Sequence, residues 1–319
     1  MGAIADKLGD KWASNMQKLL VKTLEGVFAA ESMATQIKDI SAEAGNLGIV
    51  SAEALIDAIY LLGDNYDQLS GLAMHSAVMQ KLAKLNLIDY LPDSEGKPGL
   101  PTYMGKTVIV DDGIAPKTII TTAGTKEVQT ITPTIATTAA AGTVTITAPG
   151  EAAKTVTTTT SSDVSSVIAD IVAAYAESSV WDVAAGATTV VFTAKANGVI
   201  APITVGAGDS GVAFEVAETT PGKADVTALA YPIYLFGAGA IAYNERQDAI
   251  SLETDRDIIL GQDILTSRRV FTMHPRGIKW IGNADGVTPT NAELATGTNW
   301  ELVEDAKNVL ITKLIARVA

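Results

Sequence analysis

The most apolar stretch of the chain is AYPIYLFGAGAIAY, residues 230–243. It is too short to span a bilayer as a helix, and Pro232 and two glycines interrupt it. Residues 234–236 (YLF) have the composition of a buried strand, and the glycines at 237 and 239 predict a tight turn. We therefore expect a buried strand that turns sharply and continues near Ile241.

The same glycines also fit a nucleotide-binding pattern, because residues 237–242 (GAGAIA) match G-x-G-x-x-A. Asp255 and Asp257 follow near the spacing of a ribose-binding acid. A dinucleotide site needs a helix directly after the glycines, whose N-terminus holds the pyrophosphate. Residues 243–248 (YNERQD) do not resemble the start of an amphipathic helix, and no βαβ series precedes them. A tight strand turn is the favoured interpretation.

The charge of the chain is strongly acidic and unevenly distributed. A net charge of −13 repels nucleic acid at long range, so we do not expect a dedicated DNA reader. All six arginines lie in the last quarter of the 319 residues, where they indicate subunit contacts, because arginine suits interface ion pairs. The candidate interface residues are Arg246, Arg256, Arg268, Arg269 and Arg276.

No pattern in the chain supports catalysis or a bound cofactor. The absence of cysteine excludes disulfides and thiol chemistry, and His75 and His274 alone make a weak metal pair. Residues 208–211 (GDSG) resemble the nucleophile turn of trypsin-like proteases, but neither histidine has the local pattern of a triad. The acidic residues at 111–112 and 253–257 fit turns or strands better than a cation site.

The pattern of apolar residues predicts an α+β fold. Residues 4–28 carry an apolar residue every fourth position, which predicts an amphipathic helix of about 40 Å. Ser51 and Ser76 are expected to cap two further helices, with a buried strand at 72–74 between them. A turn is expected at 92–96. Further strands are expected at 107–110, 269–273, 278–280 and 309–318.

The composition changes between about residues 118 and 226, where threonine and alanine dominate and arginine is absent. Asp163 is placed to cap a helix, and strands are expected on both sides of it in a β-β-α-β-β order. The expected strands are 144–147, 155–160, 190–192 and 214–216. We interpret this segment as an inserted β-rich domain, because about 110 residues can fold alone.

Several segments, taken in order, resemble the major capsid proteins of tailed bacteriophages. The matching segments are 73–76 (AMHS), 88–97 (IDYLPDSEGK), 101–112 (PTYMGKTVIVDD), 234–240 (YLFGAGA), 253–257 (ETDRD) through to 268–269 (RR), 271–277 (FTMHPRG), 289–294 (PTNAEL) and 299–301 (NWE). Together they cover residues 1–117 and 227–319, and the combination is specific where a single segment would not be.

The resemblance implies the Hong Kong 97-type capsid fold, which has a peripheral domain with a long spine helix and an axial domain. It assigns residues 1–50 to the peripheral domain with the spine helix, 51–117 and 227–242 to the axial domain, 118–226 to the inserted domain, and 243–319 to the returning peripheral strands. Family members usually carry an N-terminal arm and an extended loop before the spine helix, and we expect both to be absent from this chain. The segment 118–226 is a second departure, because short members cross this point in a few residues.

The resemblance also implies a structural function and no enzymatic activity. Copies of the chain are expected to assemble into pentamers and hexamers of an icosahedral head shell around phage double-stranded DNA. The expected partners are the chain itself, portal, scaffold and decoration proteins, and non-specifically packaged DNA, with no membrane. Assembly would take place in the bacterial cytoplasm, and the product would be the virion capsid. Alternatives are a phage-related protein compartment shell, a host-surface binding module formed by the insert, or an enzyme acting through Asp255 or His274.

Overall fold

The computed structural model describes residues 2–92, 98–135, 141–158, 163–206, 208, 210–246 and 251–319. The chain forms two compact units: Met1–Ile119 together with Leu229–Ala319, called unit 1, and Ile120–Ala228, called unit 2. Both helices and strands contribute to the fold, so the α+β class expected from the sequence is confirmed. The bounds of unit 2 lie two residues from those of the segment 118–226 that composition sets apart.

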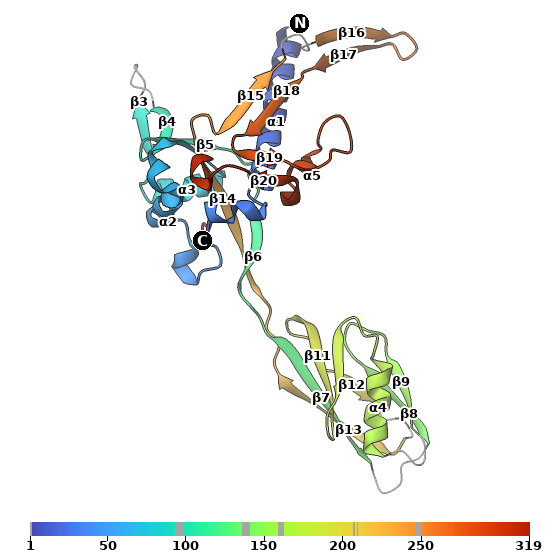
Figure 1. The fold of residues 1–319 in the computed structure, drawn as a ribbon. Coiled ribbons are helices and arrows are strands. Elements are labelled where there is room, and N and C mark those ends of the chain that lie inside the picture. Colours follow the sequence, from blue (N-terminus) through green and yellow to red (C-terminus); the bar gives the residue numbers. More distant parts are fainter. Residues whose placement is uncertain are drawn as a thin grey trace. The chain divides into compact units, whose positions relative to one another are not determined.

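Unit 1 is built on one mixed eight-stranded sheet (Figure 1). Its strands, in spatial order, are β1 (Ile37–Asp39), β21 (Ile311–Arg317), β14 (Val226–Gly237), β2 (Leu69–Met74), β5 (Lys106–Val110), β4 (Pro98–Tyr103) and β3 (Asp89–Pro92), with β6 (Lys117–Thr122) also paired to β14. The pairs β1–β21 and β2–β5 are parallel, and β14 runs antiparallel to both β21 and β2. The first and last parts of the chain therefore meet in one sheet.

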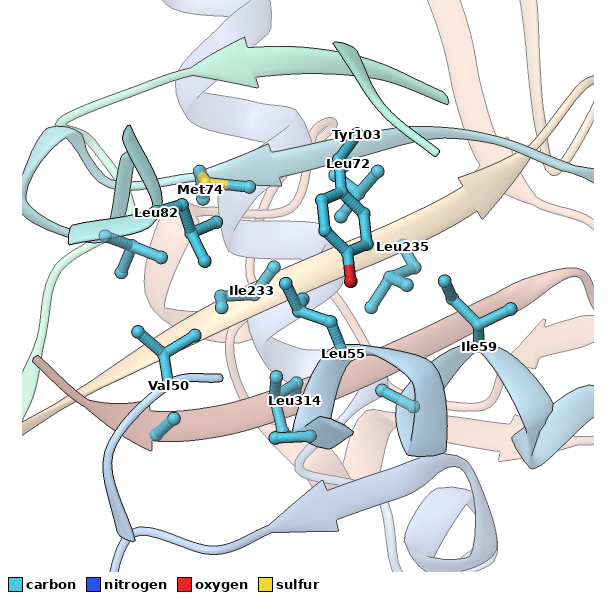
Figure 2. Close-up of a cluster of buried hydrophobic side chains, with 14 of the residues drawn as sticks. Val50, Leu55, Ile59, Leu72, Met74, Leu82, Tyr103, Ile233, Leu235 and Leu314 are labelled. Atoms are coloured by element: carbon cyan, nitrogen blue, oxygen red, sulfur yellow. The ribbon is translucent and has the colours of Figure 1, made fainter. Parts of the chain in front are cut away.

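One face of this sheet packs against α2 (Ala52–Ile59) and α3 (Ser76–Lys84). Successive side chains of a strand point to opposite faces, so Ile233 and Leu235 of β14 share this face. Figure 2 shows them beside Leu55 of α2 and Leu314 of β21. These side chains are all but completely buried, and they form the main hydrophobic core of unit 1.

The opposite face of the sheet packs against α1 (Gly2–Val27), the long helix expected from residues 4–28. Tyr234 of β14 lies against Phe28, with ring centroids 5.7 Å apart. Lys313 of β21 places its ammonium group over both rings, 5.6 to 5.7 Å from their centroids. Burial here disfavours charged side chains: it lowers the pKa of Lys313 and raises the pKa of the Tyr234 phenol.

The described part of unit 1 also contains three two-stranded sheets, one short α-helix and several 3-10 helices, of which η3 (Tyr60–Gln68) is the longest. The sheets are β15 (Ile241–Glu245) with β18 (Phe271–Pro275), β16 (Ser251–Asp257) with β17 (Gln262–Arg268), and β19 (Ile278–Trp280) with β20 (Trp300–Leu302), and the helix is α5 (Asn291–Leu294). Trp280 and Trp300 stack edge to face across β19 and β20, with centroids 4.8 Å apart. Both rings pack in the core beneath α1. Trp300 Nε1 also donates a hydrogen bond to Leu294 O of α5 at 2.8 Å.

Unit 2 contains two sheets and one helix around its own core. The sheets are β10 (Trp181–Ala185), β11 (Val190–Asn197), β7 (Lys126–Ile135) and β13 (Val212–Thr220), and β12 (Thr204–Gly206), β8 (Gly142–Thr147) and β9 (Lys154–Thr158). The helix α4 (Val164–Ala174) buries Ile168 and Ile171, and Tyr175 just beyond it donates to Ile146 O at 2.9 Å. Asp163 caps α4 with a capping box, as expected from the sequence.

Several local predictions have mixed outcomes. The Ser51 hydroxyl caps α2 by accepting from Ala54 N at 3.2 Å, which confirms that prediction. The cap of α3 was placed wrongly, because His75, not Ser76, precedes the helix and accepts from Ala77 N at 3.0 Å. An imidazole nitrogen can accept this hydrogen bond in place of a hydroxyl oxygen. The general preference for serine at helix N-caps therefore pointed to Ser76 instead of His75. Of the turn expected at 92–96, residues 93–96 lie outside the described residues.

The buried face of β14 generates the first prediction. Leu235→Ala should lower the free energy of unfolding by about 3 kcal/mol, because the change removes buried methyl groups and leaves a cavity. Calorimetry of the whole chain measures it. Leu100→Ala is the control, since Leu100 is 68% exposed and should change stability by less than about 0.5 kcal/mol. Equal effects of the two substitutions would contradict this core assignment.

Lys313 generates a prediction of pH dependence. Its folded pKa lies below its ordinary value, so just below about pH 10 the unfolded chain binds more protons than the folded chain. The free energy of unfolding should therefore rise with pH in this range. Lys313→Met should abolish that part of the rise. Denaturant unfolding of both chains between about pH 8 and pH 10 tests this, and identical pH slopes would refute it.

Candidate functional site

The glycine-rich segment after β14 forms a tight turn between strands. β14 ends at Gly237, Gly239 has a φ of +78°, and β15 begins at Ile241. A left-handed φ of this kind favours glycine. Since a strand, not a helix, follows the turn, no helix N-terminus is present to hold a pyrophosphate. The strand-turn interpretation is confirmed.

The described part of the protease-like residues 208–211 lies in the connection between β12 and β13. Asp209 lies outside the described residues. The Ser210 side chain is buried and accepts a long hydrogen bond from Val212 N at 3.4 Å. A nucleophile must meet its substrate, so this burial does not suit the role.

The acidic residues at 111–112 and the two histidines serve local structure. Hydrogen bonding from the side chain of Ser76 lowers the pKa of the Asp112 carboxyl group, and so does the bond that Asp112 accepts from Ser76 N at 3.0 Å. His75 caps α3, and His274 of β18 packs against Trp300. Among the residues that the structure describes, no three metal-ligating side chains gather, and no helix is long and apolar enough to cross a membrane.

The hairpin β16–β17 is exposed along most of its described length. Its tip carries Ile258, Ile259 and Leu260, which are 87%, 95% and 67% exposed. Both strands are exposed as well, and among the described strands each pairs only with the other. Three consecutive exposed apolar residues are unusual on a soluble surface and mark sites that other molecules cover.

The two faces of the hairpin differ in chemistry. One face carries Leu252, Thr254 and Arg256 of β16, opposite Ser267, Leu265 and Asp263 of β17. The other face carries the carboxylates Glu253, Asp255 and Asp257, called the acidic row, and Arg268 at the base of the hairpin. None of the three carboxylates forms an ion pair with another described residue, whereas Arg256 on the first face lies 4.0 Å from Asp263.

The helix α1 contacts the base of the hairpin on its first face. Trp12 Nε1 donates to Ser267 Oγ at 3.0 Å. A groove of about 450 Å³ lies beside this contact. Its walls are Leu8, Lys11, Trp12, Ser14, Asn15 and Lys18 of α1, and Leu265 and Ser267 of β17.

The lysines of α1 gather on one side of the helix. At 100° per residue, Lys7, Lys11, Lys18 and Lys22 fall within about 60° of one another. Lys22 is paired with Glu25 at 2.5 Å, whereas the other three are exposed and form no ion pair within the described part of the chain. We call Lys7, Lys11 and Lys18 the lysine stripe.

Three of the five arginines predicted from the sequence lie on or beside the hairpin. Arg256 and Arg268 are exposed on β16 and at the end of β17. Arg269 is partly buried: its guanidinium is 3.6 Å from the Glu245 carboxylate and lies over the Trp12 ring, 5.6 Å from the centroid. Arg269 therefore has a structural role within unit 1.

The other two arginines lie on separate segments. Arg246 follows β15, and its backbone N donates to Val270 O at 2.9 Å. Arg276 lies in the turn between β18 and β19, and its backbone N donates to Ala240 O at 2.9 Å. The structure therefore distributes the five arginines over several elements, and their role in subunit contacts stays a prediction.

Sequence reasoning missed the apolar hairpin tip and the lysine stripe. The signal for the tip was the run of Ile258 to Leu260 between Asp257 and Gly261, a charged residue and a turn residue. The signal for the stripe was lysine at spacings of four, seven and four, which returns to the same side of a helix.

The chain is 30% identical over 319 residues to the major capsid protein of Bacillus phage SPP1. The match covers all of this chain and 65% of the phage protein, so the chain spans slightly less than two thirds of that relative's length. No family model matches the chain. The similarity makes the two proteins distant homologues, in agreement with the resemblance drawn from the sequence segments.

Arg269 and Arg268 form a matched pair for a test of this region. Arg269→Ala should lower the free energy of unfolding by about 1 kcal/mol, because it leaves the mostly buried Glu245 without its cationic partner. Arg268→Ala should change stability by less than about 0.5 kcal/mol, since its side chain is exposed. Thermal unfolding at low protein concentration measures both, and equal shifts would contradict the structural role of Arg269.

Proposed function

We propose that this chain is a major capsid protein of a tailed phage and forms the shell of the phage head. The observation that carries the proposal is the similarity to the SPP1 capsid protein, which extends along the whole chain. The exposed apolar hairpin tip is consistent with it, because a subunit that assembles must cover such a surface with another molecule. The chain would act by self-association, without catalysis.

The finer architecture is part of the same proposal. Unit 1 would have the Hong Kong 97-type fold, with α1 as the spine helix and residues 1–50 and 243–319 as the peripheral domain. Residues 51–117 and 227–242 would form the axial domain, and 118–226 an inserted domain. The separate core of unit 2 supports its description as a domain.

The proposed partners are first of all other copies of the chain, in rings of five or six. Portal, scaffold and decoration proteins would join the same assembly. Packaged double-stranded DNA would be enclosed without sequence recognition. The net charge of −13 supports the absence of sequence recognition, because a strongly acidic protein is repelled by the phosphates of the DNA backbone.

The expected outcome of sedimentation velocity and negative-stain microscopy is rings of five or six subunits, or closed shells. Modest contacts suffice for this, because symmetry repeats each one many times. Arg268→Glu should change the distribution of species, since Arg268 is exposed on the candidate surface. A chain that stays monomeric at every concentration would refute the proposed function.

The control for Arg268→Glu must carry an exposed charge without structural contacts. Lys154, an obvious choice in unit 2, does not qualify: its Nζ donates to Ala174 O at 2.8 Å and lies over the Tyr175 ring. Lys126 is exposed at the start of β7, so Lys126→Glu is the matched control. If both reversals alter sedimentation equally, Arg268 has no special role in association.

A further inference from the structure

We infer that the acidic row of the hairpin β16–β17 docks on the lysine stripe of α1 in a second copy of the chain. The apolar tip of the hairpin fills the groove beside that stripe. This inference rests on the proposed function, since it names the contact by which copies join. It assigns roles to Glu253, Asp255, Lys11 and Lys18 that lie outside the arginines considered above.

A partner for the hairpin would stabilise it. A two-stranded hairpin is at best marginally stable in water. Within the described part of unit 1, this hairpin meets α1 near its base, where Trp12 Nε1 donates to Ser267 Oγ at 3.0 Å. The turn between β16 and β17 lies at the far end of the hairpin (Figure 1), and it carries the exposed Ile258, Ile259 and Leu260. Burial of these three side chains would order the hairpin and remove its apolar surface from water.

The partner of the acidic row must be basic. Glu253, Asp255 and Asp257 alternate along β16 and point to one face, where they span about 14 Å. Three carboxylates with no opposite charge between them repel one another. A row of cations at similar spacing would turn this repulsion into attraction.

The lysine stripe has that spacing. Lys7, Lys11 and Lys18 lie on one side of α1 and span about 16 Å at 1.5 Å per residue. They form no ion pair with a described residue, and the apolar walls Leu8, Trp12 and Leu265 lie beside them. The stripe and the groove therefore complement both the charge and the apolar tip of the hairpin.

The stripe that the acidic row meets must belong to another copy. The first face of the hairpin, with Ser267 and Leu265, is turned toward its own α1. The acidic row lies on the opposite face of the same hairpin, so it is turned away from that helix. Hairpin to helix is a contact between two different surfaces, and repeated contacts of this kind generate rings when the rotation closes.

A nucleic acid is the competing partner for the lysine stripe, since lysines neutralise phosphates. That alternative leaves the acidic row and the apolar tip without a partner, and the net charge of −13 opposes it. The contact between copies accounts for all three features. The tests below distinguish the two partners by the part played by the acidic row.

Zero-length carbodiimide cross-linking tests the contact directly, because the reagent joins only carboxylates and amines that touch. An equal mixture of natural-abundance and ¹⁵N-labelled chains is cross-linked and digested. The expected products are peptides that join Lys11 or Lys18 to Glu253 or Asp255 and carry one label of each kind. Cross-links between copies that consistently avoid these residues would overturn the inference.

Charge exchange provides the second test. Glu253→Lys with Asp255→Lys, or Lys11→Glu with Lys18→Glu, should each weaken association by at least about tenfold, since like charges then face each other. A chain carrying all four substitutions should regain association, and so should a mixture of the two double variants. Asp257 is left unchanged because its carboxylate accepts from Ile259 N and Leu260 N in the turn.

The controls place the same charges elsewhere. Asp170→Lys on α4 and Lys84→Glu on α3 alter exposed helical residues and should leave association unchanged. Ile259→Ser should weaken association, whereas Val199→Ser, at an equally exposed apolar position in unit 2, should not. Association should also weaken as salt rises, because salt screens exposed charges.

The outcomes separate this inference from the proposed function. If the wild-type chain associates and the four-substitution chain fails to recover, the contact is wrong and the capsid proposal stands. The same holds if the lysine reversals abolish DNA binding while the acidic reversals change nothing. A wild-type chain that never associates and gives no cross-links between copies overturns both.

Discussion

The burial of β14 on both faces is the constraint on which the rest of unit 1 depends. Ile233 and Leu235 face α2 and α3, and Tyr234 and Phe236 face α1, so one strand holds together two hydrophobic layers. Its neighbours β2 and β21 come from residues more than 200 positions apart. The alternation of side chains along β14 thus joins residues 69–74 and 311–317, from the two ends of unit 1, through one strand.

Periodic features were the part of this structure that sequence could predict. The stripe of residues 4–28 predicted α1, and the run at 234–236 predicted the core of β14, because both patterns follow directly from backbone geometry. Burial within α2 was only half predicted. Leu55 and Ile59 are buried, but Ile56 and Tyr60 on the same helix and its C-cap are 37% and 53% exposed, so apolar character alone does not identify the buried side.

The candidate site was harder to predict for a physical reason. Its parts come from α1 and from β16–β17, about 240 residues apart, and only the folded chain brings Trp12 to Ser267. Arginine was chosen from its general preference for interfaces, yet Arg269 is held by Glu245 and Trp12 within the subunit. Residue type alone does not separate a charge that stabilises a fold from one that is free to bind. The ion-pair partners of each charged residue separate the two cases, and only the folded structure shows these partners.

The chain enters and leaves unit 2 through adjacent backbone. Thr125 and Lys223 exchange two backbone hydrogen bonds of 2.9 Å, so the two ends of this segment lie about one strand spacing, or 5 Å, apart. Any polypeptide with closely spaced termini meets the same geometric requirement. The position between β6 and β14 therefore has the geometry of a domain insertion site, since a different domain with close termini, or a short turn, would satisfy the same pairing.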